Sequence, residues 1–205
     1  MQAHKILLLI LFALSLSSTL ISFNIFYTVF DVNNYLTSFN KEHVYRIYPD
    51  ANSRLNNILN FFLNNEDLAA SYFNYKEALH LNDVKDLINV LYKFLYFNIL
   101  IFSLIFLIIL KDLKLLSTGL IITGALILSI FIVASFIPFN NIFLWFHLTF
   151  FKNNLWLMNK TDSLILLFPL RFFQKTFQQI LVNIISLTIF IIGTGLVIKF
   201  NGLRA

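Results

Sequence analysis

Four long stretches of the chain contain no charged residue. They run over residues 6–30, 94–110, 115–151 and 176–198. A membrane-spanning helix needs about 20 apolar residues, with a range of about 17–25. The first, second and fourth stretches therefore hold one span each. The third is too long for one span and contains Pro138, and because the residue before a proline disfavours helical backbone, we predict that this span ends near Ile137.

This pattern predicts an all-α protein, a four-helix transmembrane bundle forming a single integral membrane domain over residues 1–205. The predicted spans are about 6–30, 92–110, 115–137 and 177–198, with a helical cap at 31–91 and an aromatic outer loop at 138–176. Within the cap, Leu55, Ile58, Leu59 and Phe62 recur at helical spacing, so we expect two or three short helices there. Residues 139–151 either lie in the membrane interface or re-enter the bilayer. The first apolar run is longer than a signal-peptide core, which favours an uncleaved anchor.

Composition supports a membrane protein. The chain is 59% hydrophobic and only 12% charged, about half the charged fraction usual in soluble domains. It has no Cys, which excludes disulfides, thiolate metal sites, a Cys nucleophile and a Cys-linked lipid anchor on this chain. The net charge of +5 is spread between apolar spans rather than gathered in a patch, so we expect no nucleic-acid partner.

The basic residues that flank the spans predict an orientation. On the side that holds both termini, the flanking basic residues are Lys5, Lys111, Lys114, Lys199 and Arg204, against the single acid Asp112. The other side carries more basic residues, but they are spread over two long loops and offset by acids. The positive-inside rule therefore places both termini in the cytoplasm of a multi-pass cell-membrane protein, with the two long loops facing outward.

Among the four histidines, His4 and His43 lie in polar segments and are expected to be solvated, whereas two others suggest chemistry. Glu77, His80 and Asp83 are spaced three apart, which places them on one face of a helix. A carboxylate beside an imidazole can fix its tautomer. The alternative is a solvated, charged helix face. His147 is an ionisable group within an aromatic, uncharged stretch. Such a group is either functional or an interfacial side chain that reaches the head groups.

The segment after His147 offers further candidates. Trp156 suits an interface anchor, Asp162 suits a loop salt bridge or a helix N-cap, and Arg171 either binds a lipid phosphate or extends to the interface. The nucleotide-binding, zinc-protease and nucleophile-elbow motifs G-x-G-x-x-G, G-x-x-x-x-G-K-[ST], H-E-x-x-H and G-x-S-x-G are absent. We therefore expect no nucleotide and no cofactor, and any reaction must run downhill or draw its energy from the substrate.

Taken together, several motifs resemble the bacterial lipoprotein intramolecular transacylase family. They are Glu77-x-x-His80-x-x-Asp83-Val84-Lys85, Phe146-His147-x-x-Phe150-Phe151, Trp156, Asp162-x-Leu164-Ile165 and Phe168-Pro169-x-Arg171-Phe172. The sequence departs from the family pattern at Asn74, Leu81 and Phe173, where the family favours Ser, Met and Trp.

The resemblance implies an acyltransferase that acts on diacylated lipoproteins in the membrane. It would move an acyl chain from the sn-2 ester of the diacylglyceryl-cysteine to the cysteine α-amino group, giving an N-acyl lyso-lipoprotein. The two essential histidines of the family fall on His80 and His147. Glu77 and Asp83 are then candidates for orienting His80, and we assign Lys85, Trp156, Asp162 and Arg171 to substrate binding.

The chemistry suits these residues, because imidazole can deprotonate an ammonium ion and assist collapse of a tetrahedral intermediate. The sequence leaves open which histidine is the base. Two other readings remain. In one, His80, Asp83, Glu77 and His147 hold a metal ion in a membrane hydrolase. In the other, the chain is a non-enzymatic membrane binding or assembly protein.

Overall fold

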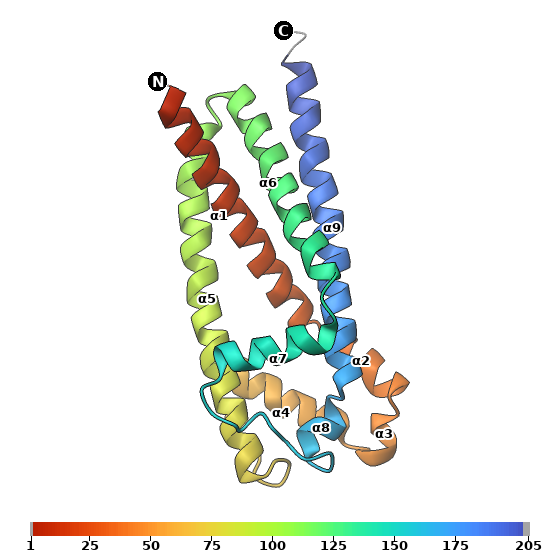
Figure 1. Ribbon diagram of the computed structural model, residues 1–205. Coiled ribbons are helices and arrows are strands. Elements are labelled where there is room, and N and C mark those ends of the chain that lie inside the picture. The colour runs from red at the N-terminus through yellow and green to blue at the C-terminus, as the bar shows by residue number, and fades with distance from the viewer. Residues whose placement is uncertain (1, 203–205) are drawn as a thin grey trace. The chain divides into compact units, whose positions relative to one another are not determined.

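The computed structural model describes residues 2–202, and within that range it contains helices and loops but no strand. The helices are α1 (Gln2–Val29), α2 (Val32–Lys41), α3 (Val44–Ile47), α4 (Ala51–Leu63), α5 (Tyr75–Ile109), α6 (Leu113–Ser135), α7 (Phe139–Phe150), α8 (Ser163–Leu167) and α9 (Leu170–Asn201) (Figure 1). The predicted all-α class is confirmed. Arg204, which contributes to the predicted orientation, lies outside the described residues.

Within the described part of the chain, α1, α5, α6 and α9 are long and apolar enough to cross a membrane. Their number agrees with the prediction, but the helices extend beyond the charge-free windows. Helix α5 begins at Tyr75, well before the apolar stretch that starts at Phe94. The bounds of the membrane-embedded segments therefore stay a prediction. Helices α6 and α7 are separated at Pro138, where the sequence predicts the break.

The chain divides into two compact units. The first, which we call the bundle unit, has its described residues within Met1–Phe26, Tyr92–Ile137 and Gln179–Ala205. The second, which we call the histidine unit, comprises Tyr27–Leu91 and Pro138–Gln178. Helices α1, α5 and α9 each contribute residues to both units.

In the bundle unit, parts of α1, α5, α6 and α9 lie side by side (Figure 1). Phe12 of α1 is fully buried in a cluster with Ile109 and Leu116, and Ile198 of α9 packs against it. The Asn24 side-chain amide donates to the carbonyl of Ile180, 2.9 Å away, which links α1 to α9. Such packing and polar contacts between helices are what hold membrane bundles together.

One end of the bundle unit gathers several of the basic flanking residues. Lys5 near the start of α1 forms an ion pair of 2.8 Å with Asp112 in the turn between α5 and α6. That turn also carries Lys111, and Lys114 follows it. Ile198, next to Lys199, packs on the same cluster as Ile109 and Leu116. The flanking basic residues on which the predicted orientation rests, apart from Arg204, therefore gather at one end of this unit.

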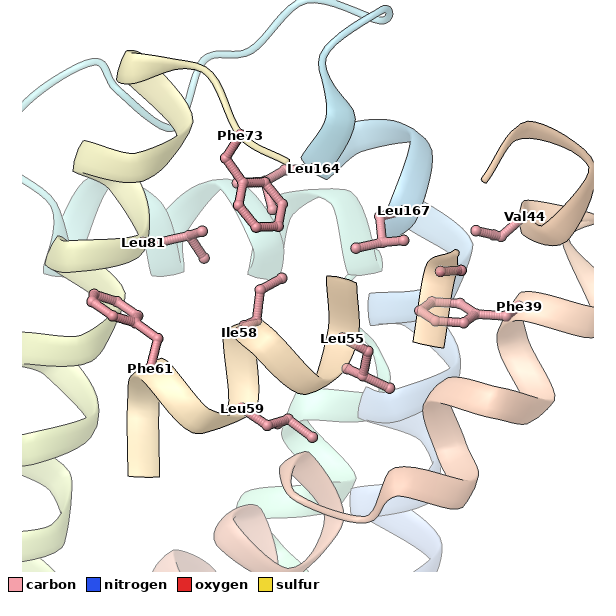
Figure 2. Packing of buried hydrophobic residues seen from close by; sticks show 11 residues of the cluster. Phe39, Val44, Leu55, Ile58, Leu59, Phe61, Phe73, Leu81, Leu164 and Leu167 are labelled. Atoms are coloured by element: carbon pink, nitrogen blue, oxygen red, sulfur yellow. The ribbon is translucent and has the colours of Figure 1, made fainter. Parts of the chain in front are cut away.

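The histidine unit has its own hydrophobic core. The buried side chains come from α2, α3, α4, the loop before α5, the start of α5, and α8: Phe39, Val44, Ala51, Leu55, Ile58, Leu59, Phe61, Phe73, Leu81, Leu164 and Leu167. Figure 2 shows Ile58 of α4 pointing toward Phe73 and Leu164. The helix predicted from Leu55, Ile58, Leu59 and Phe62 is α4, with the first three buried and Phe62 packed against the cluster. This core fixes α5 and α8 relative to each other.

Candidate active site

Helix α5 begins with a capping box that places His80 in its second turn. The Asn74 side-chain oxygen accepts from the backbone N–H of Glu77, 3.0 Å away, and Glu77 accepts in return from the backbone N–H of Asn74 at 2.7 Å. Reciprocal bonds of this kind satisfy backbone N–H groups that the first turn of a helix leaves without partners. The start of the helix that carries His80 is therefore fixed by its own sequence.

Glu77 also ties α5 to α8. Its second carboxylate oxygen accepts from the backbone N–H of Leu164 at 2.7 Å, and the residue is only 1% exposed. Both oxygens therefore act as acceptors, as expected of an ionised carboxylate. Neither oxygen bonds to His80 among the described residues. The structure places Glu77 one turn before His80, as a buried link between two helix starts.

Helix α7 carries His147 and fixes which of its ring nitrogens holds the proton. Nδ1 of His147 lies 2.7 Å from the carbonyl oxygen of Phe143, one turn earlier. A carbonyl oxygen can only accept, so Nδ1 must carry the proton and donate it. In the neutral ring, Nε2 is then left with a free lone pair, which is the form that a general base needs.

Burial favours the neutral form of this ring. His147 is only 8% exposed. It does not lie in a membrane-spanning helix, because α7 has 12 residues and, at about 18 Å, is too short to span a bilayer. Burial lowers the pKa of His147, and the bond to the Phe143 carbonyl opposes that shift without cancelling it. Because the pKa falls below that of free imidazole, the unprotonated form persists to lower pH.

The fold brings His80 and His147 together although they are far apart in the sequence. Their ring centroids are 6.3 Å apart and their planes differ by 26°. No hydrogen bond joins the rings among the described residues. Nδ1 of His80 is buried and has no hydrogen-bond partner there. The two histidines therefore offer the lone pair of Nε2 on His147 and, on His80, an Nδ1 that has no hydrogen-bond partner among the described residues.

Aromatic side chains surround the pair. The ring of Phe151 lies 5.1 Å from that of His80 and 5.5 Å from that of His147, between centroids. Trp156 packs at 4.9 Å from His147, and Phe143 at 4.2 Å. This surrounding is water-poor, and polar interactions are stronger in such a setting than in bulk water. Of the residues assigned to substrate binding, Trp156 is the one that contacts a histidine ring.

Three other predicted site residues, Asp83, Lys85 and Asp162, form hydrogen bonds or a cation–π contact with groups other than the two histidine rings. Asp83 accepts from the Asn153 side chain at 2.9 Å rather than from His80. The Lys85 ammonium sits over the Phe61 ring, 4.1 Å from its centroid. Asp162 is the N-cap residue of α8, but its side chain makes no capping bond and instead accepts from the backbone N–H of Asn159 at 2.7 Å.

Arg171 belongs to a separate cluster. Its guanidinium lies 3.9 Å from a carboxylate oxygen of Glu42, which Lys175 also approaches to 2.6 Å. The bond from Lys175 lowers the pKa of Glu42, and Arg171 adds to the effect. No described contact joins this cluster to either histidine of the pair. Arg171 is 77% exposed, so it remains open to an external anion.

Three residues that bond to the predicted site residues were not predicted as their partners from the sequence: Asn74, Asn153 and Glu42. Asn74 has a local signal, because Asn-x-x-Glu before an apolar run is a helix-start pattern. Asn153 and Glu42 have no such signal, since their partners come from segments distant in the sequence.

The structure offers no ligand set for the metal alternative. Residues 2–202 contain no group of three His, Cys, Asp or Glu side chains placed to hold an ion.

Comparison with known proteins gives this site a context. The model of the family described as lipoprotein intramolecular transacylase Lit matches residues 5–173. The chain belongs to the lipoprotein intramolecular transacylase family. Both histidines of the pair and all the residues assigned to the site lie within the matched range. No curated protein matches the sequence.

Solved structures of a Lit protein share the fold. The chain is similar to the membrane-integral lipoprotein intramolecular transacylase Lit from Bacillus cereus, with a TM-score of 0.85 and 18% identity over 100% of both chains. Variants of that protein with a histidine replaced by Arg or by Ala match with TM-scores of 0.81 and 0.82, also at 18% identity. These alignments cover 99% and 100% of this chain and 96% and 98% of theirs.

Proposed function

We propose that this member of the Lit family transfers the sn-2 acyl chain of a diacylglyceryl-cysteine to the α-amino group of the same cysteine. The product is an N-acyl lyso-lipoprotein. The observation that carries the proposal is the histidine pair: a buried, neutral His147 with its free Nε2, next to His80 inside an aromatic shell. An ester-to-amide transfer requires a base that deprotonates the amine and a second group that stabilises the intermediate or protonates the leaving group, and two adjacent imidazoles can supply both.

In the proposed mechanism His147 is the base. Near neutral pH the substrate α-amino group is largely an ammonium ion, with a pKa of about 7.7–8.0. Nε2 of His147 takes one of its protons, and the freed amine attacks the ester carbonyl carbon. A C–N bond forms, and the carbonyl electrons move onto oxygen. Collapse of this intermediate breaks the bond to the glyceryl oxygen, which takes the proton held on His147 and leaves as an alcohol. The nitrogen then gives its surplus proton to the regenerated imidazole, which releases it to water.

His80 acts on the tetrahedral intermediate rather than on the amine. Its ring stands 6.3 Å from that of His147, so both rings can reach one tetrahedral centre bound beside them. We assign to it stabilisation of the oxyanion or protonation of the leaving alkoxide. Glu77 acts on His80 as a positioning residue, since its two bonds fix the helix start that carries the imidazole.

The reaction needs no outside energy source. An amide is more stable than an ester, so transfer to an amine is downhill. Nucleophile and ester belong to one molecule, and holding two groups in reactive geometry contributes about 7–11 kcal/mol to lowering a barrier. Trp156 then orients His147, while Lys85, Asp83, Asp162 and Arg171 are assigned to substrate contact or to supporting the site. Of these, the exposed Arg171 is the one suited to an anionic lipid group.

We place this reaction in the cell membrane, with both termini in the cytoplasm and the histidine pair toward the outer leaflet. The support is the positive flank near Lys5 and Lys111, which the positive-inside rule assigns to the cytoplasm. A membrane-impermeant label at Lys5 should react only in opened cells or inverted vesicles. Labelling at Leu144 of α7 tests whether this helix re-enters the bilayer, because loop-like labelling rates would refute re-entry.

The function is tested by mass spectrometry of lipoprotein N-termini from a host that normally leaves them diacylated. Expression of the chain should yield N-acyl, S-monoacyl peptides. His80→Ala and His147→Ala should lower the yield about 10²–10⁴-fold, the usual contribution of a general acid or base. His4→Ala, a matched change at an exposed histidine of the bundle unit, should leave it unchanged. Unmodified diacyl peptides, with the protein present in the membrane, would refute the transfer.

A further inference from the structure

A groove lies beside the histidine pair, within the histidine unit. Its volume is about 450 Å³, and its apolar walls are Leu87, Val90 and Leu91 of α5 together with Phe150 and Phe151 where α7 ends. Sites that hold small molecules usually have volumes of about 300–1,000 Å³. The mechanism described above assigns no role to this space.

Phe151 joins the groove to the reacting centre. It lines the groove, and its ring is in contact distance of both histidine rings, at 5.1 Å from His80 and 5.5 Å from His147 between centroids. Asp83, which also lines the groove, follows His80 by one turn of α5. A ligand lying in the groove therefore ends next to the histidine pair.

The lining suits a hydrocarbon chain. Leu87, Val90 and Leu91 recur at the spacing of one helix face, and the stretch from Asp83 to Leu91 extends about 12 Å at 1.5 Å per residue. The space is thus elongated along α5 and bounded by aliphatic and aromatic groups. Burial of each methylene group there contributes about 0.8 kcal/mol, or about fourfold in affinity.

The charges of the lining argue against a phospholipid head group as the occupant. Two carboxylates, Asp83 and Asp86, border the groove against one ammonium, that of Lys152. A phosphate would meet like charge there. The ester of a diacylglyceryl-cysteine is uncharged and its amine is cationic, so that substrate meets no such repulsion.

We propose that this groove holds the acyl chain that is transferred, and that Leu87 and Val90 set the chain length the protein accepts. The inference rests on the proposed function. In that reaction the attacked carbonyl lies at the histidines, so the chain attached to it must leave the reacting centre through adjoining apolar space. The groove that shares Phe151 with both histidines is that space.

The test uses the full-length chain in liposomes and two synthetic lipopeptides that differ only in the placement of their chains. One carries palmitoyl at sn-2 and hexanoyl at sn-1, and the other carries the reverse, so that the short chain ends before the filled positions. Leu87→Trp and Val90→Trp fill the groove at a half-buried and an exposed position, so at least one should fold. Leu100→Trp, at a 57% exposed position further along the same helix, is the control. Initial rates of N-acyl product are measured by mass spectrometry.

The groove-filling variants should lose activity on the sn-2 palmitoyl isomer at least about tenfold more than on the sn-2 hexanoyl isomer, because two lost methylene contacts already amount to more than tenfold. Leu100→Trp should keep the ratio of the unaltered protein. Equal losses on both isomers, unchanged rates, or a selective loss on the sn-1 palmitoyl isomer would each overturn the inference while leaving the transfer itself intact. Failure of the unaltered protein to acylate either isomer would instead refute the proposed function.

Discussion

Replacing Glu77 with Gln should destabilise the protein substantially, because it breaks a buried link between α5 and α8. The carboxylate accepts from the N–H groups of Asn74 and Leu164, both at 2.7 Å, and the residue is 1% exposed. A glutamine has one acceptor oxygen and one NH₂ group, so one of these N–H donors then faces another donor. A buried donor without a partner costs about 1–3 kcal/mol.

The second bond also weakens, because hydrogen bonds to charged groups contribute about 1.5–3 kcal/mol and neutral ones about 0.5–1.5 kcal/mol. The two effects together give a loss of about 2–4 kcal/mol in the free energy of unfolding. For a chain of this size each kcal/mol corresponds to about 2–4 °C, so Glu77→Gln should lower the melting temperature by about 4–16 °C.

Thermal unfolding of the purified protein in detergent, followed by tryptophan fluorescence, measures this change. Trp156 is a suitable probe because it packs on His147 in the same unit. The matched control is Glu66→Gln, since Glu66 is exposed and, among residues 2–202, its side chain accepts from the Asn60 side chain alone. Surface changes of this kind stay within about 0.5 kcal/mol. If Glu77→Gln melted within about 1 °C of the unaltered protein while Glu66→Gln did the same, the inferred role of the buried carboxylate would be wrong.

Two further predictions concern the surroundings of His147, and a third concerns helix packing in the bundle unit. Trp156→Ala removes the ring that packs 4.9 Å from His147 and should slow transfer up to about tenfold, from a loss of about 0.5–1.5 kcal/mol, whereas a full-rate variant would refute that contact's role. At pH 6.5, where free imidazole is half protonated, ¹⁵N NMR should show His147 mostly neutral with its proton on Nδ1, because burial lowers its pKa; a titration midpoint at or above 6.5 would contradict this. Gly124→Ala would place a methyl group against Ile192 and should cost about 1–3 kcal/mol in a detergent unfolding assay, whereas Gly193→Ala, with open space around it, should cost nothing measurable; equal effects would refute the packing argument.

The four membrane helices could be predicted because an uninterrupted apolar run of their length has few other structures open to it. Where the helices begin was harder to predict. Lys93 ends the apolar window, but Lys93, Asp86 and Lys76 do not break a helix. Helix α5 therefore runs through them and begins at the cap that Asn74 provides. A search for capping patterns, rather than for charges, would have found that start.

The candidate site was predictable only in part. His147 stands out because an ionisable group is rare in an aromatic stretch, and His80 stands out because Glu77 and Asp83 share its helix face. The family resemblance then pointed to both histidines. Their proximity depends on contacts between distant segments, as does the bond from the backbone of Leu164 to Glu77. Local spacing suggests instead that Glu77 faces His80, because the sequence contains no sign that backbone N–H groups will occupy both carboxylate oxygens. The Arg171–Glu42 contact is of the same kind.

The most direct test of the account is whether the acyl chain and the amine that receives it come from the same molecule. The purified chain in liposomes is given an equal mixture of two diacyl lipopeptides, one with a deuterated sn-2 chain and a light peptide, the other with an ordinary chain and a heavy peptide. The account predicts N-acyl products with only the two parental mass combinations, formed by the unaltered protein and not by His147→Ala. Crossed combinations, or release of free fatty acid without N-acylation, would contradict it.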